Sequence, residues 1–183
     1  MKKFELFFIL MLCTLAIELK GQTSTSVPKH GFSLGPMFGY DYKLKGPTLG
    51  AGLIYEYKPF QRLGFTAGFN YELTRKNLPN TDYNVSDGGV LTHQVYSLSL
   101  GARYYLNSLY IGGALGFAHE SGKSLMNDGT KYDGGSANSL YKVLGLGYQL
   151  PLRNGDLMEF ELGTFGTKNS MKLGGTVRYK ILR

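Results

Sequence analysis

The chain has 183 residues and a formal net charge of +7, and it is rich in glycine (26 residues) and tyrosine (14 residues). Charged residues make up 18% of it, below the roughly 25% of an average soluble domain. Outside the N-terminal segment, no apolar run reaches the about 18 residues that a membrane-spanning helix needs. Because no such run is present, a bundle of transmembrane helices is excluded. The length indicates a single folded domain.

The N-terminal segment has the features of a secretory signal peptide. Lys2 and Lys3 precede an apolar core over residues 6–17, and Gly21 is a small residue where cleavage could fall. We therefore expect residues 1–21 to be a signal peptide, 22–30 a flexible lead and 31–183 the folded domain. Cys13, the one cysteine, falls within the signal peptide. The mature chain would then have no disulfide.

The folded domain alternates between apolar and small or polar residues with a period of two, which is typical of β-strands. The clearest stretch is residues 95–117, which is interrupted only by the two-residue turn Asn107-Ser108. In chain order, the pattern predicts eight strands, at residues 31–43, 48–58, 63–75, 95–106, 109–118, 140–150, 157–165 and 173–181.

The two faces of these strands differ in kind. One face carries large apolar side chains, and the other carries glycine, small and charged residues. A soluble barrel puts its bulky apolar face inside, whereas a membrane barrel turns that face to lipid. The small residues suit a crowded interior, so the sequence predicts an all-β fold, an eight-stranded antiparallel up-and-down transmembrane β-barrel. A secreted soluble ligand-binding barrel is the alternative, and it requires the apolar face to lie inward.

The connections fall into two groups. Those after the second, fourth and sixth predicted strands are tight, and two at the opposite end, residues 76–89 and 121–137, are long and rich in Gly, Asp and Asn. Outer-membrane barrels have short periplasmic turns and longer external loops. We therefore expect both long loops to be external.

The chain resembles the small outer-membrane β-barrel family of the OmpA/OmpX type, in the form common in Bacteroidota. The resemblance covers about residues 32–182 and rests on the signal peptide, the strand architecture and Gly-aromatic strands such as GAGLIYEY and GGTVRYKI. It implies a location in the outer membrane of a Gram-negative bacterium and insertion by the outer-membrane assembly machinery. It implies no particular function, because one fold serves many functions.

The inward face collects charges of both signs. Buried charges must pair because desolvation is costly, so the near balance predicts an ion-pair network that fills the lumen. Its predicted members are Glu56, Glu72, Arg103, Glu120, Glu159, Glu161, Lys172, Arg178 and Lys180. A narrow gated conduit is the functional alternative, although eight strands leave little room for one.

Basic residues gather at the external end and predict a rim that faces the phosphates of lipopolysaccharide. Its members are Lys43, Lys45, Arg75, Lys76, Lys123, Lys131 and Lys168. A mixed solvated surface would have the same composition. The positive charge does not indicate nucleic-acid binding, because the chain is predicted to be exported and has no basic helix or RNA-binding motif.

His119 and Ser121 form the sharpest catalytic candidate. Their spacing resembles the His-x-Ser element of lipid A deacylase barrels, in which a histidine base activates a serine nucleophile and a carboxylate orients the histidine. The resemblance implies His119 as base and Ser121 as nucleophile. Gly122 stands where that family has Asn, the alternation turns His119 toward lipid, and no residue is assigned as the carboxylate.

The sequence therefore predicts a non-enzymatic outer-membrane barrel that acts through its external loops and lipid contacts, with no cofactor and no metal. Its expected partners are outer-membrane lipid, lipopolysaccharide and the assembly machinery, and the sequence names no loop ligand. A lipid A modifying hydrolase that uses His119 and Ser121 is the alternative in a different class.

Overall fold

The computed structural model describes residues 29–78 and 88–183. The predicted signal peptide, most of the lead and residues 79–87 of the first predicted long loop lie outside these ranges. The described residues form eight strands, β1 (His30–Asp41), β2 (Gly46–Phe60), β3 (Leu63–Leu78), β4 (Gly89–Leu106), β5 (Leu109–Met126), β6 (Lys131–Pro151), β7 (Leu157–Gly166) and β8 (Met171–Leu182).

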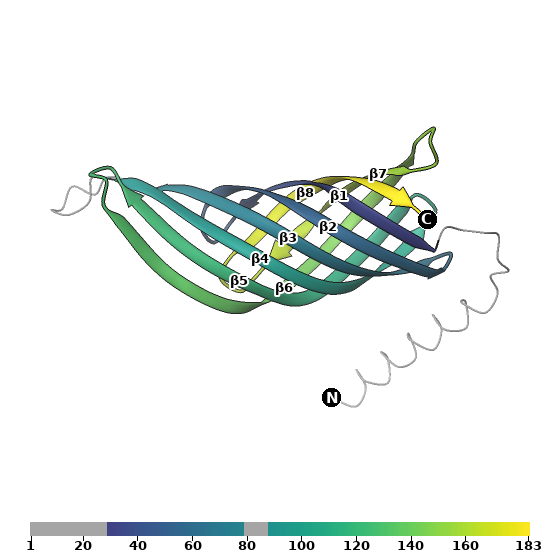
Figure 1. Ribbon diagram of the computed structural model, residues 1–183, viewed down its shortest axis with the longest axis horizontal. Helices are drawn as coiled ribbons and strands as arrows, with labels where there is room; N and C mark the ends of the chain where they lie inside the picture. The colour runs from purple at the N-terminus through teal and green to yellow at the C-terminus, as the bar shows by residue number, and fades with distance from the viewer. Residues whose placement is uncertain (1–28, 79–87) are drawn as a thin grey trace, which may run out of the picture.

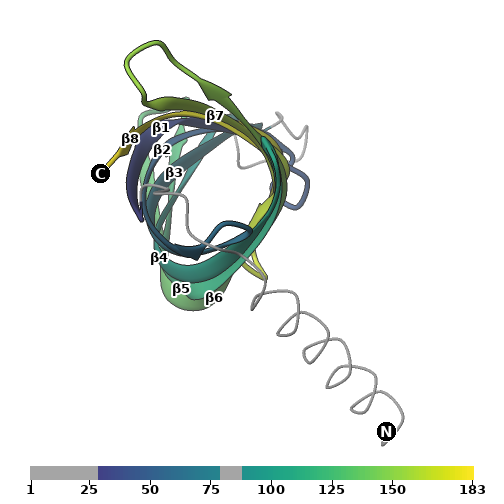
Figure 2. The same cartoon turned by 90° about the vertical axis from the view of Figure 1, so that its right-hand side faces the viewer.

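The eight strands form one closed antiparallel barrel in which each strand pairs with its neighbour in sequence. Closure is made by β1 and β8, which pair from Gly31 with Leu182 to Asp41 with Lys172. Figure 1 shows the strongly tilted strands, and Figure 2 shows the closed ring from the end that carries the C-terminus. The predicted all-β, eight-stranded, up-and-down architecture is confirmed.

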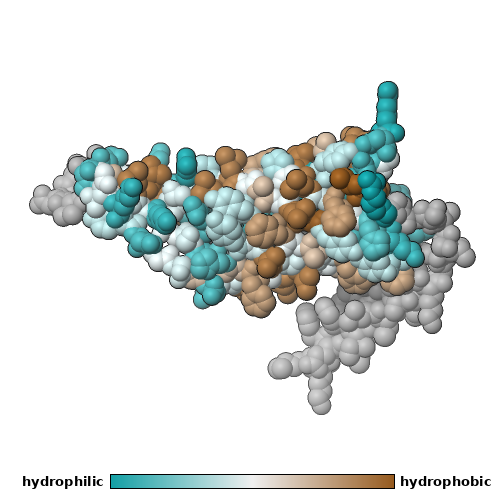
Figure 3. Space-filling view, viewed as in Figure 1, coloured by the Kyte–Doolittle hydropathy of each residue, from teal (hydrophilic) through white to brown (hydrophobic). Residues whose placement is uncertain are grey.

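The barrel is apolar outside and charged inside. Phe117 is 81% exposed and Leu100 72% exposed, whereas Glu159 and Lys172 are fully buried. Apolar residues gather over the middle of the barrel in Figure 3, and hydrophilic residues dominate the end formed by the β5–β6 hairpin. The soluble ligand-binding barrel is therefore wrong, because it requires the apolar face inside. Within the described ranges, no helix is long and apolar enough to cross a membrane.

The predicted long loop at residues 121–137 is wrong. β5 continues to Met126 and β6 begins at Lys131, so only a short turn remains between them. Glycine and aspartate lower strand propensity, but pairing with neighbouring strands overrides this preference here. A register shift between Ser121 and Lys123 accommodates the glycine-rich part of β6.

Strand extension makes the barrel asymmetric. At the end opposite the C-terminus, β3 to β6 continue beyond the level at which β1, β2, β7 and β8 stop, as Figure 1 shows. Four consecutive strands remain paired in this extension, from β3 residues 75–78 to β6 residues 131–136. We call these extended parts of β3 to β6 the wall. Residues at the external end therefore lie at two heights. Some are in the β1–β2 and β7–β8 turns, and others are farther out on the wall.

Candidate functional site

The inner half of the lumen, nearer the C-terminus, is organised around Arg103 of β4. Its Nη1 atom lies 3.2 Å from Glu159 Oε1 and 3.4 Å from Glu56 Oε2, and its Nη2 atom lies 3.1 Å from Glu161 Oε2. The three carboxylates come from β2 and β7 on either side of the ring, so the guanidinium group links distant strands. Arg103 is buried, as are Glu56 and Glu159.

Two further cations complete this inner cluster. Lys180 of β8 pairs with Glu56 and lies 3.1 Å from Glu159, and Arg178 lies 3.2 Å from Glu161. The cluster thus holds three carboxylates and three cations. Balanced charge with direct pairing is the condition under which ionised groups are tolerated away from water.

Uncharged polar groups supply further hydrogen bonds to these carboxylates. The Tyr105 hydroxyl donates to Glu56 at 2.6 Å, and the Tyr110 hydroxyl donates to Glu161 at 2.8 Å. Gln149 and Ser33 both donate to Glu159, at 2.7 and 3.0 Å. These four residues were not among the predicted sites. Their inward position in the alternation was the available signal.

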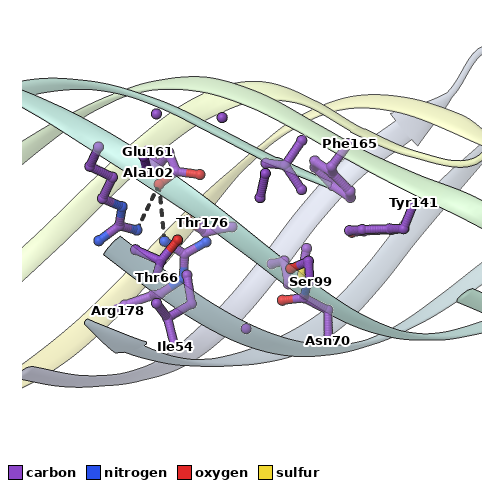
Figure 4. Close-up of a pocket in the computed structure, with 17 residues that line it drawn as sticks. Ile54, Thr66, Asn70, Ser99, Ala102, Tyr141, Glu161, Phe165, Thr176 and Arg178 are labelled. Atoms are coloured by element: carbon purple, nitrogen blue, oxygen red, sulfur yellow. Dashed lines mark hydrogen bonds and ion pairs between the residues drawn. The ribbon is translucent and has the colours of Figure 1, made fainter. Parts of the chain in front are cut away.

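An apolar layer lies across the lumen nearer the wall. It consists of Met37, Val95, Ala118, Tyr141 and Phe165. Beside it is a cavity of about 50 Å³, drawn in Figure 4, whose lining includes Arg178 and Thr176. A space of this size holds no more than a few water molecules.

A second, outer cluster lies beside this layer, since Glu72 is opposite Val95 and Lys172 is opposite Phe165. Glu72 Oε2 lies 2.6 Å from Lys172 Nζ, and the other carboxylate oxygen of Glu72, Oε1, accepts a hydrogen bond from the Tyr141 hydroxyl. Asp41 accepts hydrogen bonds from the backbone N–H groups of Lys43 and Leu44, at 2.9 and 2.8 Å, and from the Ser170 hydroxyl.

The structure thus divides the nine predicted lumen residues among three groups. Six lie in the inner cluster, and Glu72 and Lys172 pair in the outer cluster. Glu120 is also buried and forms no ion pair with the described members of either cluster, and it lies beside His93, whose Nε2 atom is 3.3 Å from Glu120 Oε2. His93 was not a predicted member. Across the described ranges, no group of three or more His, Cys, Asp or Glu residues is arranged to hold a metal ion.

The seven predicted rim residues do not form one ring. Lys43, Lys45 and Lys168 lie in the β1–β2 and β7–β8 turns, where the Lys43 ammonium donates to the Lys168 carbonyl. The other four lie on the wall, namely Arg75, Lys76, Lys123 and Lys131. The sequence could not separate these two heights, because the separation depends on how far each strand continues.

Strand register aligns two of the wall cations. Arg75 of β3 is opposite Thr92 of β4, and Thr92 is opposite Lys123 of β5. Residues directly opposite each other point to the same side of a sheet, so Arg75 and Lys123 flank Thr92 on one face. Both basic residues are exposed.

The His119 and Ser121 candidate lies on the outer side of β5. His119 is exposed, and its Nδ1 atom lies 3.0 Å from Asn138 Oδ1. Asn138 thus occupies the position in which a hydrolase of this type needs a carboxylate. Glu120, between the two candidate residues, points into the lumen, so within residues 29–78 and 88–183 no carboxylate hydrogen-bonds to His119.

Comparison with known proteins finds no matching family and no matching curated protein. Among solved structures, Ail, the attachment invasion locus protein of Yersinia pestis, is similar over 85% of this chain and 100% of its own, with 16% identity and a TM-score of 0.57. A structure of Ail in complex with the heparin analogue sucrose octasulfate covers 83% of this chain and 97% of its own, with 19% identity and a TM-score of 0.56. At this level of identity the likeness establishes the fold, and the chain therefore has the eight-stranded barrel fold found in Ail.

Proposed function

We propose that this chain is an integral outer-membrane protein of a Gram-negative bacterium, with a side-chain-filled lumen and a structural or surface-interaction role. The observation that carries the proposal is the reversal of polarity, with large apolar side chains outside and ionised residues inside. A closed barrel has no unpaired strand edge within the bilayer, so it satisfies its backbone hydrogen bonds there. Each strand has ten or more residues, enough for a tilted crossing.

The lumen supports a structural role rather than a pore. The inner cluster and the apolar layer contribute side chains from opposite sides of the ring, and the cavity between them has a volume of about 50 Å³. In small barrels the interior is filled by side chains in this way. The ion pairs would then stabilise the barrel, and any interaction with partners would occur on the outside.

The wall supports a role in surface interaction with phosphate- or sulfate-bearing molecules. It raises four basic residues above the apolar surface, and aligned Arg75 and Lys123 provide two exposed cations on one face. Guanidinium and ammonium groups form charge-assisted hydrogen bonds with such anions. Ail binds a sulfated heparin analogue, which is compatible with polyanion binding on this fold.

The apolar surface below the wall suits the lipid part of lipopolysaccharide. Two shallow hollows of about 440 and 490 Å³ share Phe69, Leu98 and Phe117 among their linings. These residues lie six positions below Arg75 on β3 and Lys123 on β5, on the same face. Lipopolysaccharide, with acyl chains below and phosphates above, is the partner proposed for this face.

Membrane insertion is tested by refolding the mature chain into phospholipid vesicles and detergent. Folded barrels of this class migrate differently in gels before and after boiling, and we expect that shift together with protection of β1 to β8 from added protease. Aggregation in detergent and vesicles, with a soluble folded form in buffer, would contradict the proposal. Export through residues 1–21 and insertion by the assembly machinery are part of the same proposal.

Polyanion binding is tested with two charge-matched double variants. Arg75→Gln/Lys123→Gln removes two positive charges from the wall, and Lys29→Gln/Arg153→Gln removes two at the opposite end. We expect the wall variant alone to weaken binding to lipopolysaccharide in nanodiscs. Equal weakening of binding in both variants would mean that net charge alone explains the effect. It would contradict a specific role of the wall in binding.

A further inference from the structure

Glu120 is a buried carboxylate without a hydrogen bond. The residue is 3% exposed, and within the described chain neither of its carboxylate oxygens accepts a hydrogen bond. Among the described residues, the basic atom within ion-pair distance of Glu120 is Nε2 of His93, which lies 3.3 Å from Glu120 Oε2. These two atoms do not form a hydrogen bond. An ionised carboxylate in such a place is costly unless a positive charge compensates it.

The surroundings do not supply that charge. The strongest charge effects on His93 come from Lys172 of β8, Glu120 of β5, Asp41 of β1 and Glu72 of β3. Three are carboxylates, and Lys172 is already paired with Glu72 at 2.6 Å. With the imidazole neutral, these four groups together carry three negative charges and one positive charge, a net charge of −2. The inner cluster, by contrast, is balanced.

We propose that Glu120 and His93 bind a divalent transition-metal ion of the Zn²⁺ class at the outer end of the lumen. A divalent cation would cancel the net charge of −2. Imidazole nitrogen and carboxylate oxygen are ligands that such ions accept, and two ligand atoms about 2.0–2.1 Å from a tetrahedral ion lie roughly 3.3–3.4 Å apart. The observed separation of 3.3 Å between His93 Nε2 and Glu120 Oε2 matches that spacing.

The ring of His93 is not committed to another partner. Its Nδ1 atom is buried and has no hydrogen-bond partner within the described residues. The His93 side chain is 13% exposed and that of Glu120 is 4% exposed, so an ion would enter from the external mouth past the histidine. Two protein ligands leave the remaining coordination positions to water, which makes this an exchangeable site rather than a closed structural one.

The test uses the refolded, untagged mature barrel in detergent, titrated calorimetrically with Zn²⁺ alone. We expect one ion per chain, with binding weakened at least about tenfold in Glu120→Gln and in His93→Ala. His119→Ala is the matched control, because His119 is exposed on the outer face beside Asn138 and its loss leaves the proposed ligands in place. Heat-dependent gel mobility checks that every variant is folded.

Crystals soaked in Zn²⁺ locate the ion independently. An anomalous peak beside His93 and Glu120 in the wild type, absent from folded Glu120→Gln, would support the site. Three results would overturn it: no stoichiometric binding, equal binding by all variants, or a peak only at exposed histidines. If the wild-type barrel binds no metal and Glu120→Gln is more stable than the wild type, the buried carboxylate is not compensated by a bound ion and the site is overturned.

Discussion

At the scale of single residues, Arg103 joins more of the inner lumen than any other side chain described here. It contacts Glu56, Glu159 and Glu161. Arg103→Ala would leave these carboxylates buried with one cation fewer, and removing one partner from a buried ion pair typically costs about 3–5 kcal/mol. We expect a loss of that size in the free energy of unfolding, measured by urea titration of the barrel in lipid vesicles.

Arg153→Ala is the control for this measurement. Arg153 lies exposed in the turn between β6 and β7, and exposed substitutions usually change stability by no more than about 0.5 kcal/mol. If Arg103→Ala had an equally small effect, water would have to replace the guanidinium group, and the lumen would not be filled as proposed.

Gly116 illustrates why the inward face is rich in small residues. A Cβ atom at this position would overlap the carbonyl oxygen of Leu98 and lie 2.6 Å from Ser99 Cα, both on the backbone of β4. We expect Gly116→Ala to destabilise the barrel by about 1–3 kcal/mol, as overpacking does elsewhere. At Gly122 an added Cβ atom meets no atom of the described residues within 4 Å, so Gly122→Ala is the comparison variant, and we expect its free energy of unfolding to be unchanged.

Residue alternation predicted which side chains face inward, including Arg103 and Glu56, because a strand offers only two faces. It could not predict their pairing. Arg103 and Glu56 lie on non-neighbouring strands, and the contact depends on the tilt and closure of the whole barrel. Tyr105 and Tyr110 were missed for a related reason: tyrosine is common on both faces of strands, so its type alone does not identify a hydrogen bond to a buried carboxylate.

At the scale of elements, the β5–β6 hairpin shows how local composition can mislead. Residues 121–137 contain the glycine, aspartate and asparagine that normally mark loops, yet they pair with each other and, through β5, with β4. The pairing of the four neighbouring strands β3 to β6 is a tertiary effect. The local sequence pattern of residues 121–137 does not reveal it. The predicted strands inside the apolar surface were located well because burial of one face fixes their register.

The turn of this hairpin is held by Asp128 and Thr130. The Thr130 backbone N–H and hydroxyl donate to the two Asp128 carboxylate oxygens, at 2.7 and 2.8 Å. These hydrogen bonds lower the pKa of Asp128 below its ordinary value. Their stabilising effect is therefore present above that ordinary pKa and is lost as the pH falls through the lowered one.

Thr130→Val removes the hydroxyl and keeps the backbone N–H, so we expect the pKa of Asp128 to rise partway toward its ordinary value. Carboxyl-selective nuclear magnetic resonance titration in detergent measures this pKa directly. An unchanged Asp128 titration would mean that the hydroxyl contact is not formed in solution.

At the scale of the whole molecule, strand count and polarity were the most predictable features. An even number of strands in sequential pairing brings both ends of the barrel domain to the same side, and the reversed polarity follows from the two faces of each strand. The apolar layer of Met37, Val95, Ala118, Tyr141 and Phe165 was not predicted. Inward residues on separate strands become one layer only when the ring closes.

Closure of the lumen leads to a prediction about conduction. The inner cluster is cross-linked by Arg103 and flanked by buried Tyr105 and Tyr110, whose rings lie 5.4 Å apart. Hydrated ions would have to displace these groups together with the apolar layer beyond them. We therefore expect the wild-type chain to show no steady channels in planar bilayers.

Combined replacement of Arg103, Tyr105 and Tyr110 by alanine would thin this obstruction while leaving the outer face intact, and we expect it to produce brief or small conductance events. Replacement of the neighbouring outward residues Tyr104 and Leu106 by alanine is the control, because it changes the lipid-facing surface and not the lumen. Steady wild-type conductance that the control shares would contradict a filled lumen. It would instead require the ion pairs around Arg103 to open in the native membrane.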